Sequence, residues 1–172
     1  MVPDLSNIRL LLLDVDGVMT DGRIIFDNFG NEFKAVDVKD GHGLKLVQRA
    51  GIRVGIITGR NSQVVARRAE ELGITLVYQG VKDKRIPFDE ILEQLQLKPE
   101  QVAYAGDDLV DLPLLRRAGF SATVADAAEE VKPHVHLVTK RCGGRGAVRE
   151  ICDHLLKGAG LWEGVTARYA ID

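Results

Sequence analysis

Residues 10–20 read LLLLDVDGVMT, so that four leucines run directly into two carboxylates separated by one residue. A short apolar run of this kind is typical of a strand buried on both faces of a parallel sheet. Because side chains alternate along a strand, Asp14 and Asp16 can point the same way, and Gly17 lets the chain turn sharply after them. Neighbouring buried carboxylates need compensation, for which Mg²⁺ is the common choice where phosphate is handled. A strand-end turn with two solvated aspartates is the alternative for this stretch alone.

The composition of the chain excludes several classes of partner. The 172 residues carry 23 Lys and Arg against 25 Asp and Glu, a formal charge of −2, which gives no reason to expect nucleic acid or an anionic membrane. No stretch approaches the roughly 20 apolar residues of a membrane helix, and the first residues do not resemble a signal peptide. Cys142 and Cys152 have neither metal-type spacing nor a disulfide framework. We therefore expect a cytoplasmic protein with one domain, residues 1–172.

Apolar runs of strand length alternate with segments of helical periodicity along most of the chain. Strands are expected at residues 8–15, 53–58, 75–78, 102–105, 120–124 and 136–138. Helices are expected at residues 41–50, 61–72, 83–95, 109–118, 127–131 and 145–156. A β-hairpin is expected within residues 21–38 and a tail over residues 159–172. The alternation predicts a doubly wound α/β domain, with a Rossmann-like parallel sheet covered by helices on both faces.

Polar side chains follow each of the first four strands of this predicted sheet. Asp14 and Asp16 end the first strand, Thr58-Gly59-Arg60 ends the second, Lys84 follows the third, and Gly106 to Asp111 ends the fourth. Ligands of such sheets bind at the carboxyl ends of the strands. Two carboxylates, a hydroxyl and a lysine at one edge suit phosphoryl transfer, with one acid as nucleophile and another as proton donor. Taken singly, Thr58 could cap a helix, Lys84 could be a solvated helix lysine, and Asp111 could be an ordinary first-turn acid.

In order and spacing, these groups together resemble the four motifs of the haloacid dehalogenase-like phosphatases. The resemblance implies that Asp14 is the nucleophile and Asp16 the general acid and base. It implies that Thr58 binds the phosphoryl group and that Lys84 steadies it. It also implies an Mg²⁺ ion bound by Asp14, by the backbone carbonyl of Asp16 and by Asp107.

Three further stretches resemble one branch of that family, the 3-deoxy-D-manno-octulosonate 8-phosphate phosphatases. They are Asp40-Gly41-His42-Gly43, Tyr78-Gln79-Gly80, and GGRGAVRE at residues 143–150, and the resemblance runs from about residue 8 to 156. Relatives often carry Arg and Tyr where this chain has Lys39 and His42. The implied activity is hydrolysis of this eight-carbon sugar acid phosphate in lipopolysaccharide biosynthesis. The implied substrate contacts are Asp16, Asp37, Val38, Lys39, Asp40, Gly41, Lys45, Arg60, Arg68 and Lys84.

Other functions compete with this reading. A phosphatase for a nine-carbon sialic-type acid phosphate is a close second, because related domains act there. A non-catalytic domain that oligomerises or regulates another enzyme needs none of Asp14, Lys84 or Asp107, all of which are present. A receiver domain that keeps a stable phosphoaspartate has no use for an acid and base at Asp16.

The same resemblance bears on assembly, because phosphatases of this family usually cover their site with an inserted cap domain. Here the first insertion point holds only the hairpin of residues 21–38, and the second holds one helix, so the chain looks capless. The hairpin is rich in large apolar side chains, namely Ile24, Ile25, Phe26, Phe29 and Phe33. Self-association would bury them, and the resemblance implies a homotetramer in which neighbouring subunits close each site. A hairpin folded back on its own domain is the alternative.

Overall fold

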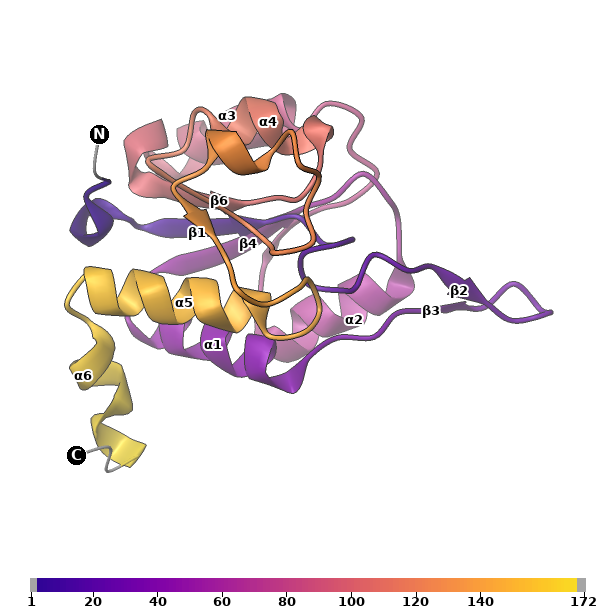
Figure 1. Cartoon of the computed structure of the whole chain (residues 1–172), viewed down its shortest axis with the longest axis horizontal. Coiled ribbons are helices and arrows are strands. Elements are labelled where there is room, and N and C mark those ends of the chain that lie inside the picture. Colours follow the sequence, from indigo (N-terminus) through magenta and orange to yellow (C-terminus); the bar gives the residue numbers. More distant parts are fainter. Residues whose placement is uncertain (1–2, 170–172) are drawn as a thin grey trace.

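Six parallel strands form the central sheet of the computed structural model, which describes residues 3–169 (Figure 1). In spatial order the strands are β5 (Leu76–Tyr78), β4 (Arg53–Ile57), β1 (Leu10–Leu13), β6 (Val102–Ala105), β7 (Phe120–Thr123) and β8 (Leu137–Val138). The central strand β1 pairs with both β4 and β6, and Leu10 lies opposite Arg53 and Val102. The predicted doubly wound sheet is confirmed, and the strand that carries Asp14 lies between the strands that lead to Thr58 and Asp107.

Helices cover both faces of this sheet (Figure 1). One face carries α1 (Val38–Arg49), α2 (Gln63–Leu72) and α5 (Ala147–Gly158), and the other carries α3 (Arg85–Leu95) and α4 (Leu112–Leu115). The side chains of the four leucines of β1 pack alternately on the two faces of the sheet. Leu11 and Leu13 pack in the cluster that includes α1 and α5, whereas Leu10 and Leu12 pack with α3 and β6. This alternation explains why the run is apolar at every position rather than at every second one.

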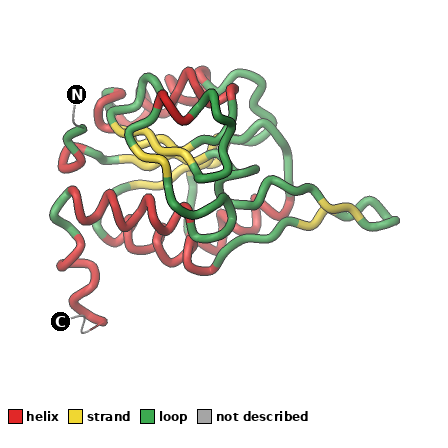
Figure 2. The backbone as a smooth tube through the Cα atoms, viewed as in Figure 1, coloured by secondary structure: helices red, strands yellow, loops and turns green. Residues whose placement is uncertain are grey.

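A two-stranded hairpin projects from the body of the molecule, as the extended loops of Figure 2 also show. It consists of β2 (Ile25–Phe26) and β3 (Glu32–Phe33), which pair antiparallel. Asp27 closes its turn by accepting hydrogen bonds from the backbone N–H groups of Phe29 and Asn31, both at 2.8 Å. Phe29 at the tip is 90% exposed, so the tip of the hairpin does not fold back on its own chain.

The structure corrects several predicted boundaries. α1 begins at Val38 rather than near residue 41, because the Asp37 side chain caps it by accepting from the N–H of Lys39 at 2.7 Å. The short helix predicted at residues 127–131 is wrong, since this segment forms turns. The helix predicted at 109–118 is reduced to one 3₁₀ turn, η3 (Leu109–Asp111), and the four residues of α4. Other 3₁₀ turns are η1 (Leu5–Asn7), η2 (Pro99–Gln101) and η4 (Lys132–His134).

The segment predicted as a tail is largely helical. It forms α6 (Trp162–Thr166) and η5 (Ala167–Tyr169), while residues 170–172 lie outside the described residues. Trp162 packs against the main core cluster, and the hydroxyl of Tyr169 accepts a hydrogen bond from Arg49 of α1 at 3.2 Å. Residues 162–169 therefore pack against the body of the protein. Across residues 3–169, no helix has the length and apolar character needed to cross a membrane.

Candidate active site

The carboxyl ends of the central strands surround a cavity of about 740 Å³. Six of the residues that the sequence singled out line it, namely Asp14, Asp16, Thr58, Arg60, Lys84 and Asp107. They come from the ends of β1 and β4 and from the loops after β5 and β6. The topology of the parallel sheet thus brings together residues that lie up to 93 positions apart, from Asp14 to Asp107.

The loop after β1 depends on Gly17, whose φ of +95° is a conformation that favours glycine. A Cβ atom at this position would also lie 2.0 Å from Oδ2 of Asp107. The backbone carbonyl of Val15 accepts hydrogen bonds from the next turn, including the N–H of Met19 at 2.9 Å. Gly17 therefore lets the loop approach Asp107 closely while Asp14 and Asp16 stay at the mouth of β1.

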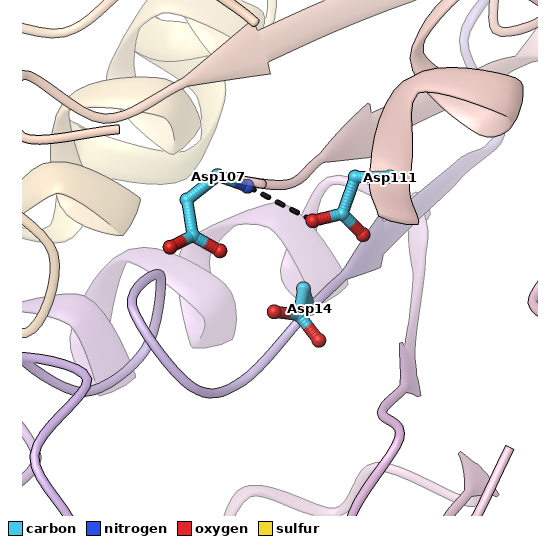
Figure 3. Close-up of side chains that lie close together, drawn as sticks. All are labelled: Asp14, Asp107 and Asp111. Atoms are coloured by element: carbon cyan, nitrogen blue, oxygen red, sulfur yellow. Dashed lines mark hydrogen bonds between the residues drawn. The ribbon is translucent and has the colours of Figure 1, made fainter. Parts of the chain in front are cut away.

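Three carboxylates converge beside this loop, as Figure 3 shows for Asp14, Asp107 and Asp111. One oxygen from each lies within 4.8 Å of the others. Burial raises the pKa of Asp14 to about 6, an effect that Lys84 opposes and Asp111 adds to. Burial and the charges of Asp14 and Asp111 raise the pKa of Asp107 to about 8. The cluster has an excess of negative charge that a cation would relieve.

Lys84 joins two of these acids. It precedes α3 and is 7% exposed, and its Nζ donates to Oδ1 of Asp14 at 2.7 Å and to Oδ1 of Asp111 at 2.6 Å. Burial alone would lower the pKa of Lys84, but the two carboxylates outweigh it and raise the pKa above its usual value. Lys84 is thus a charged group held beside Asp14, and the solvated-lysine alternative is wrong.

Asp111 is the fully buried centre of this network. Its Oδ1 also accepts the hydroxyl of Tyr104 at 2.6 Å, and its Oδ2 accepts the backbone N–H of Asp108 at 3.2 Å. The same Oδ2 accepts the backbone N–H of Asp107 at 3.0 Å, the hydrogen bond drawn in Figure 3. Together with the Lys84 ammonium, four donors therefore bind this one carboxylate, and all of its hydrogen-bond acceptor positions are used. Asp111 therefore orients its neighbours. Sequence analysis missed Tyr104, although a tyrosine on a buried strand signals a hydroxyl that needs a partner.

The remaining cavity residues differ in their surroundings. Thr58 is 2% exposed at the end of β4, and within residues 3–169 its hydroxyl has no hydrogen-bond partner. It does not cap α2, because Ser62 does so by accepting from the N–H of Val65 at 3.5 Å. The side chain of Arg60 is 47% exposed, and its Nη2 lies 3.9 Å from Oε1 of Glu32. The Asp16 carboxylate accepts a hydrogen bond from Lys34 of the hairpin, which sequence analysis did not single out.

Within one chain, Asp40 does not face the cavity. It is 3% exposed, and its Oδ1 accepts the backbone N–H of Arg149 at 2.7 Å in the first turn of α5. Gly146, the residue before that helix, has no side chain to cap it, so Asp40 of α1 supplies the cap. Among residues 3–169 its buried Oδ2 has no hydrogen-bond partner, and burial raises the pKa of Asp40 to about 6.

Lys45 and Arg68 also lie away from the cavity. The Nζ of Lys45 donates to the carbonyl of Leu72 at 2.7 Å, and Lys45 lines a separate hollow near the amino ends of β4 and β5. The guanidinium of Arg68 pairs with Glu71 at 2.8 Å and packs against Gly41, where a Cβ atom would lie 2.2 Å from Nη2. Its Nη2 also donates to the carbonyl of Asp37 at 3.4 Å, so it joins α1 to α2. The other predicted contacts outside the cavity lie at the amino end of α1, namely Asp37, Gly41 and the exposed Val38 and Lys39.

The parallel sheet and its carboxylate cluster define a hydrolase of the haloacid dehalogenase-like class, and the sequence model of the haloacid dehalogenase-like hydrolases matches residues 37–119. A 3-deoxy-D-manno-octulosonate 8-phosphate phosphatase of Yersinia pestis is 50% identical over 161 residues, which cover 94% of this chain and 86% of the relative. One from Escherichia coli K12 is 50% identical over 155 residues, 90% of this chain and 82% of the relative. At this identity the chain belongs to the 3-deoxy-D-manno-octulosonate 8-phosphate phosphatase family.

Solved structures agree with this assignment. The phosphatase of this name from Moraxella catarrhalis, in complex with magnesium ion, phosphate ion and KDO, is 40% identical with a TM-score of 0.94. That match covers 96% of this chain and 95% of the other. A cobalt-bound phosphatase of the same kind from Haemophilus influenzae has a TM-score of 0.90 at 39% identity, covering 98% of this chain and 99% of the other.

Proposed function

We propose that this protein is an Mg²⁺-dependent phosphatase that hydrolyses 3-deoxy-D-manno-octulosonate 8-phosphate to the free sugar acid (Kdo) and phosphate in lipopolysaccharide biosynthesis. The observation that carries the proposal is the placement of Asp14. Its carboxylate lies at the end of β1, in a cavity of about 740 Å³, next to the ammonium of Lys84 and across from Asp107. A carboxylate held beside a cation at the edge of a cavity is suited to attack a phosphoryl group.

The acidic cluster fits Mg²⁺. We propose Asp14, Asp107 and the backbone carbonyl of Asp16 as its ligands, all of them hard oxygen donors of the kind that Mg²⁺ prefers. The raised pKa of Asp107 supports this set, because burial and the charges of Asp14 and Asp111 disfavour its ionised form, which a bound cation would stabilise. Asp111 is left out, because its oxygens already accept four hydrogen bonds. When bound, the ion supplies positive charge that neutralises phosphoryl oxygens during transfer.

The reaction then proceeds in two steps on the residues of this chain. The Asp14 carboxylate attacks phosphorus, the bond from phosphorus to the sugar oxygen breaks, and Asp16 gives its proton to that leaving oxygen. In the second step Asp16 takes a proton from water, which attacks the aspartyl phosphate and releases phosphate and free Asp14. Lys84 and the unpartnered hydroxyl of Thr58 provide donors for the phosphoryl oxygens.

For the sugar acid, we propose Arg60 as the main cationic contact, because its guanidinium is partly exposed at the cavity and can pair with a carboxylate. Asp40 and Arg68 are engaged within their own chain, and we propose that they shape residues 37–41 rather than contact substrate. Val38 and Lys39 are exposed and lie outside this cavity, so they suit contacts with a neighbouring subunit's substrate.

We further propose that residues 1–172 form one capless domain that assembles as a homotetramer in the cytoplasm. The hairpin supports assembly, because Phe26, Phe29 and Phe33 are 58%, 90% and 53% exposed within one chain. Such a concentration of aromatic surface on a projecting ribbon is unfavourable in water and favours burial by another subunit. Neighbouring hairpins would then take the place of an inserted cap domain.

Phosphate release by the purified full-length chain tests the proposed activity. We expect release from 3-deoxy-D-manno-octulosonate 8-phosphate with Mg²⁺, loss of release in excess chelator, and recovery when Mg²⁺ is restored. A nine-carbon sialic-type acid phosphate should give the lower kcat/KM. Higher kcat/KM for the nine-carbon compound would replace the proposed substrate, and no release from either sugar with Mg²⁺ present would end the proposal.

A further inference from the structure

Lys34 lies at the base of the hairpin, directly after β3, and its side chain is only 1% exposed. Its ammonium donates to Oδ1 of Asp16 and lies 3.4 Å from Oε1 of Glu32. A lysine is rarely buried unless it is paired, because removing its charge from water is costly. Two carboxylates from different segments compensate that charge here. Lys34 thus connects the hairpin directly to the cavity.

Glu32 is itself held on the side away from Lys34. Its Oε2 accepts the hydroxyl of Ser62, the residue that caps α2, and Ser62 in turn donates its N–H to Oε1 of Gln79 at 2.8 Å. The hydrogen bond from Ser62, together with the charge of Lys34, holds the pKa of Glu32 below its usual range. A chain of contacts therefore runs from Asp16 through Lys34 and Glu32 to the amino end of α2.

In the part of the chain that the structure describes, the Asp16 carboxylate is restrained by Lys34 alone. Within residues 3–169, Lys34 is the only side chain that hydrogen-bonds or pairs with it, and the Asp16 side chain remains 21% exposed toward the cavity. The loop at Asp16 fixes the backbone, but two side-chain torsions remain free unless a partner restrains them. When a proton donor is displaced by about 1 Å, the reaction rate can fall on the order of 100-fold.

We propose that Lys34 is a positioning residue for the reaction, whose ammonium aims the Asp16 carboxylate at the leaving oxygen of the substrate. This inference rests on the proposed function, in which Asp16 transfers the proton. Lys34 does not contact substrate, because its side chain is only 1% exposed and does not line the cavity. Because Glu32 and Lys34 belong to the hairpin, the position of that ribbon governs the proton transfer.

The test compares a leaving group that needs a proton with one that does not. We expect Lys34→Met to lower kcat/KM for 3-deoxy-D-manno-octulosonate 8-phosphate by about tenfold more than for p-nitrophenyl phosphate, because nitrophenolate leaves unprotonated. Lys34→Arg should restore most of the loss, since it keeps a cation at the same place. The matched control is Arg23→Met, which removes a hairpin cation that pairs with Asp21 at 2.6 Å and is 67% exposed. It should leave the ratio of the two kcat/KM values unchanged.

A double-mutant cycle separates positioning from packing. In an Asp16→Asn background, Lys34→Met should change the ratio by less than about twofold, because no proton donor remains to be aimed. Equal losses on both substrates, or a full further loss in the Asp16→Asn background, would show that Lys34 only stabilises the fold. A rise in KM with kcat unchanged would make it a binding residue instead.

Stability and activity controls keep the outcomes distinct. Thermal unfolding of each variant identifies those that do not fold. If Lys34→Met does not fold, Glu32→Gln replaces it, because this change removes a carboxylate charge that holds the Lys34 ammonium. Glu32→Gln should shift the ratio in the same direction, and an unchanged ratio would overturn the inference. Failure of the unmodified protein to hydrolyse the sugar phosphate refutes the proposed function separately. In that case a simple alkyl phosphate, which also needs a proton on its leaving oxygen, replaces the sugar phosphate in the ratio of kcat/KM values.

Discussion

Replacing Asp111 by Asn removes the negative charge at the centre of the buried network while nearly preserving shape. Asp111 is fully buried and accepts from Lys84 and Tyr104 on one oxygen and from two backbone N–H groups on the other. An amide has only one accepting oxygen, so in either orientation its NH₂ group faces two donors. The Tyr104 hydroxyl can rotate to accept, but the Lys84 ammonium cannot.

The expected cost follows from these contacts. Breaking one partner of a buried, hydrogen-bonded charge typically destabilises a protein by about 3–5 kcal/mol. Lys84 keeps Asp14 as a partner at 2.7 Å, which places the expected loss at the lower end, about 3 kcal/mol. For a chain of this size, each kcal/mol lowers Tm by roughly 2–4 °C, so Tm should fall by about 6–12 °C.

Urea unfolding followed by circular dichroism, in excess chelator, measures this loss without a contribution from metal binding. The matched control is Asp108→Asn, which changes an exposed neighbour whose Oδ1 accepts the N–H of Leu109 at 2.7 Å. Asn serves equally well at such a position, so the control should stay within about 0.5 kcal/mol of the original protein. An Asp111→Asn variant as stable as the Asp108→Asn control would refute the central role of Asp111.

Three further predictions concern catalysis, pH and assembly. Asp14→Asn should lower kcat by several orders of magnitude with normal circular dichroism, because an amide cannot form the acyl phosphate; near-normal turnover, with deamidation excluded by mass spectrometry, would rule out Asp14 as nucleophile. Burial raises the pKa of Asp40 from 3.8, the usual value of an exposed aspartate, to about 6 in the folded protein, so its contribution to stability is present below pH 4 and is lost as pH rises through 6. We therefore compare the free energies of unfolding of Asp40→Asn and the original protein in urea. Between pH 4 and pH 7.5 the difference should shift in favour of Asp40→Asn by on the order of 1–2 kcal/mol, and a difference that does not change with pH would contradict the buried charge. Charged substitutions at Phe26 and Phe29 should dissociate the assembly in analytical ultracentrifugation and lower sugar phosphate turnover, whereas an active monomeric original protein would exclude the proposed tetramer.

Much of the site follows from sequence alone because a parallel sheet gathers its strand ends at one edge. The apolar run before Asp14 identifies the central strand, and the same reasoning places Thr58, Lys84 and Asp107 beside it without knowledge of any contact. The hairpin was also predictable, since two short extended runs flank a turn rich in Gly, Asn and Asp. In these cases the information is local, or it follows from the direction of the strands.

The direction of individual side chains on helices and on the hairpin was decided only by the tertiary structure. Asp40 caps a helix that begins more than 100 positions later, and Arg68 turns toward Gly41 rather than toward the cavity. Lys34 meets Asp16 because the base of the hairpin folds over the loop after β1, a contact that the spacing of residues does not encode. Residue types and their order determine which groups arrive at the edge of the sheet. Which of them share a hydrogen bond depends on the packing of segments distant in sequence, where burial requires each charge to find a partner.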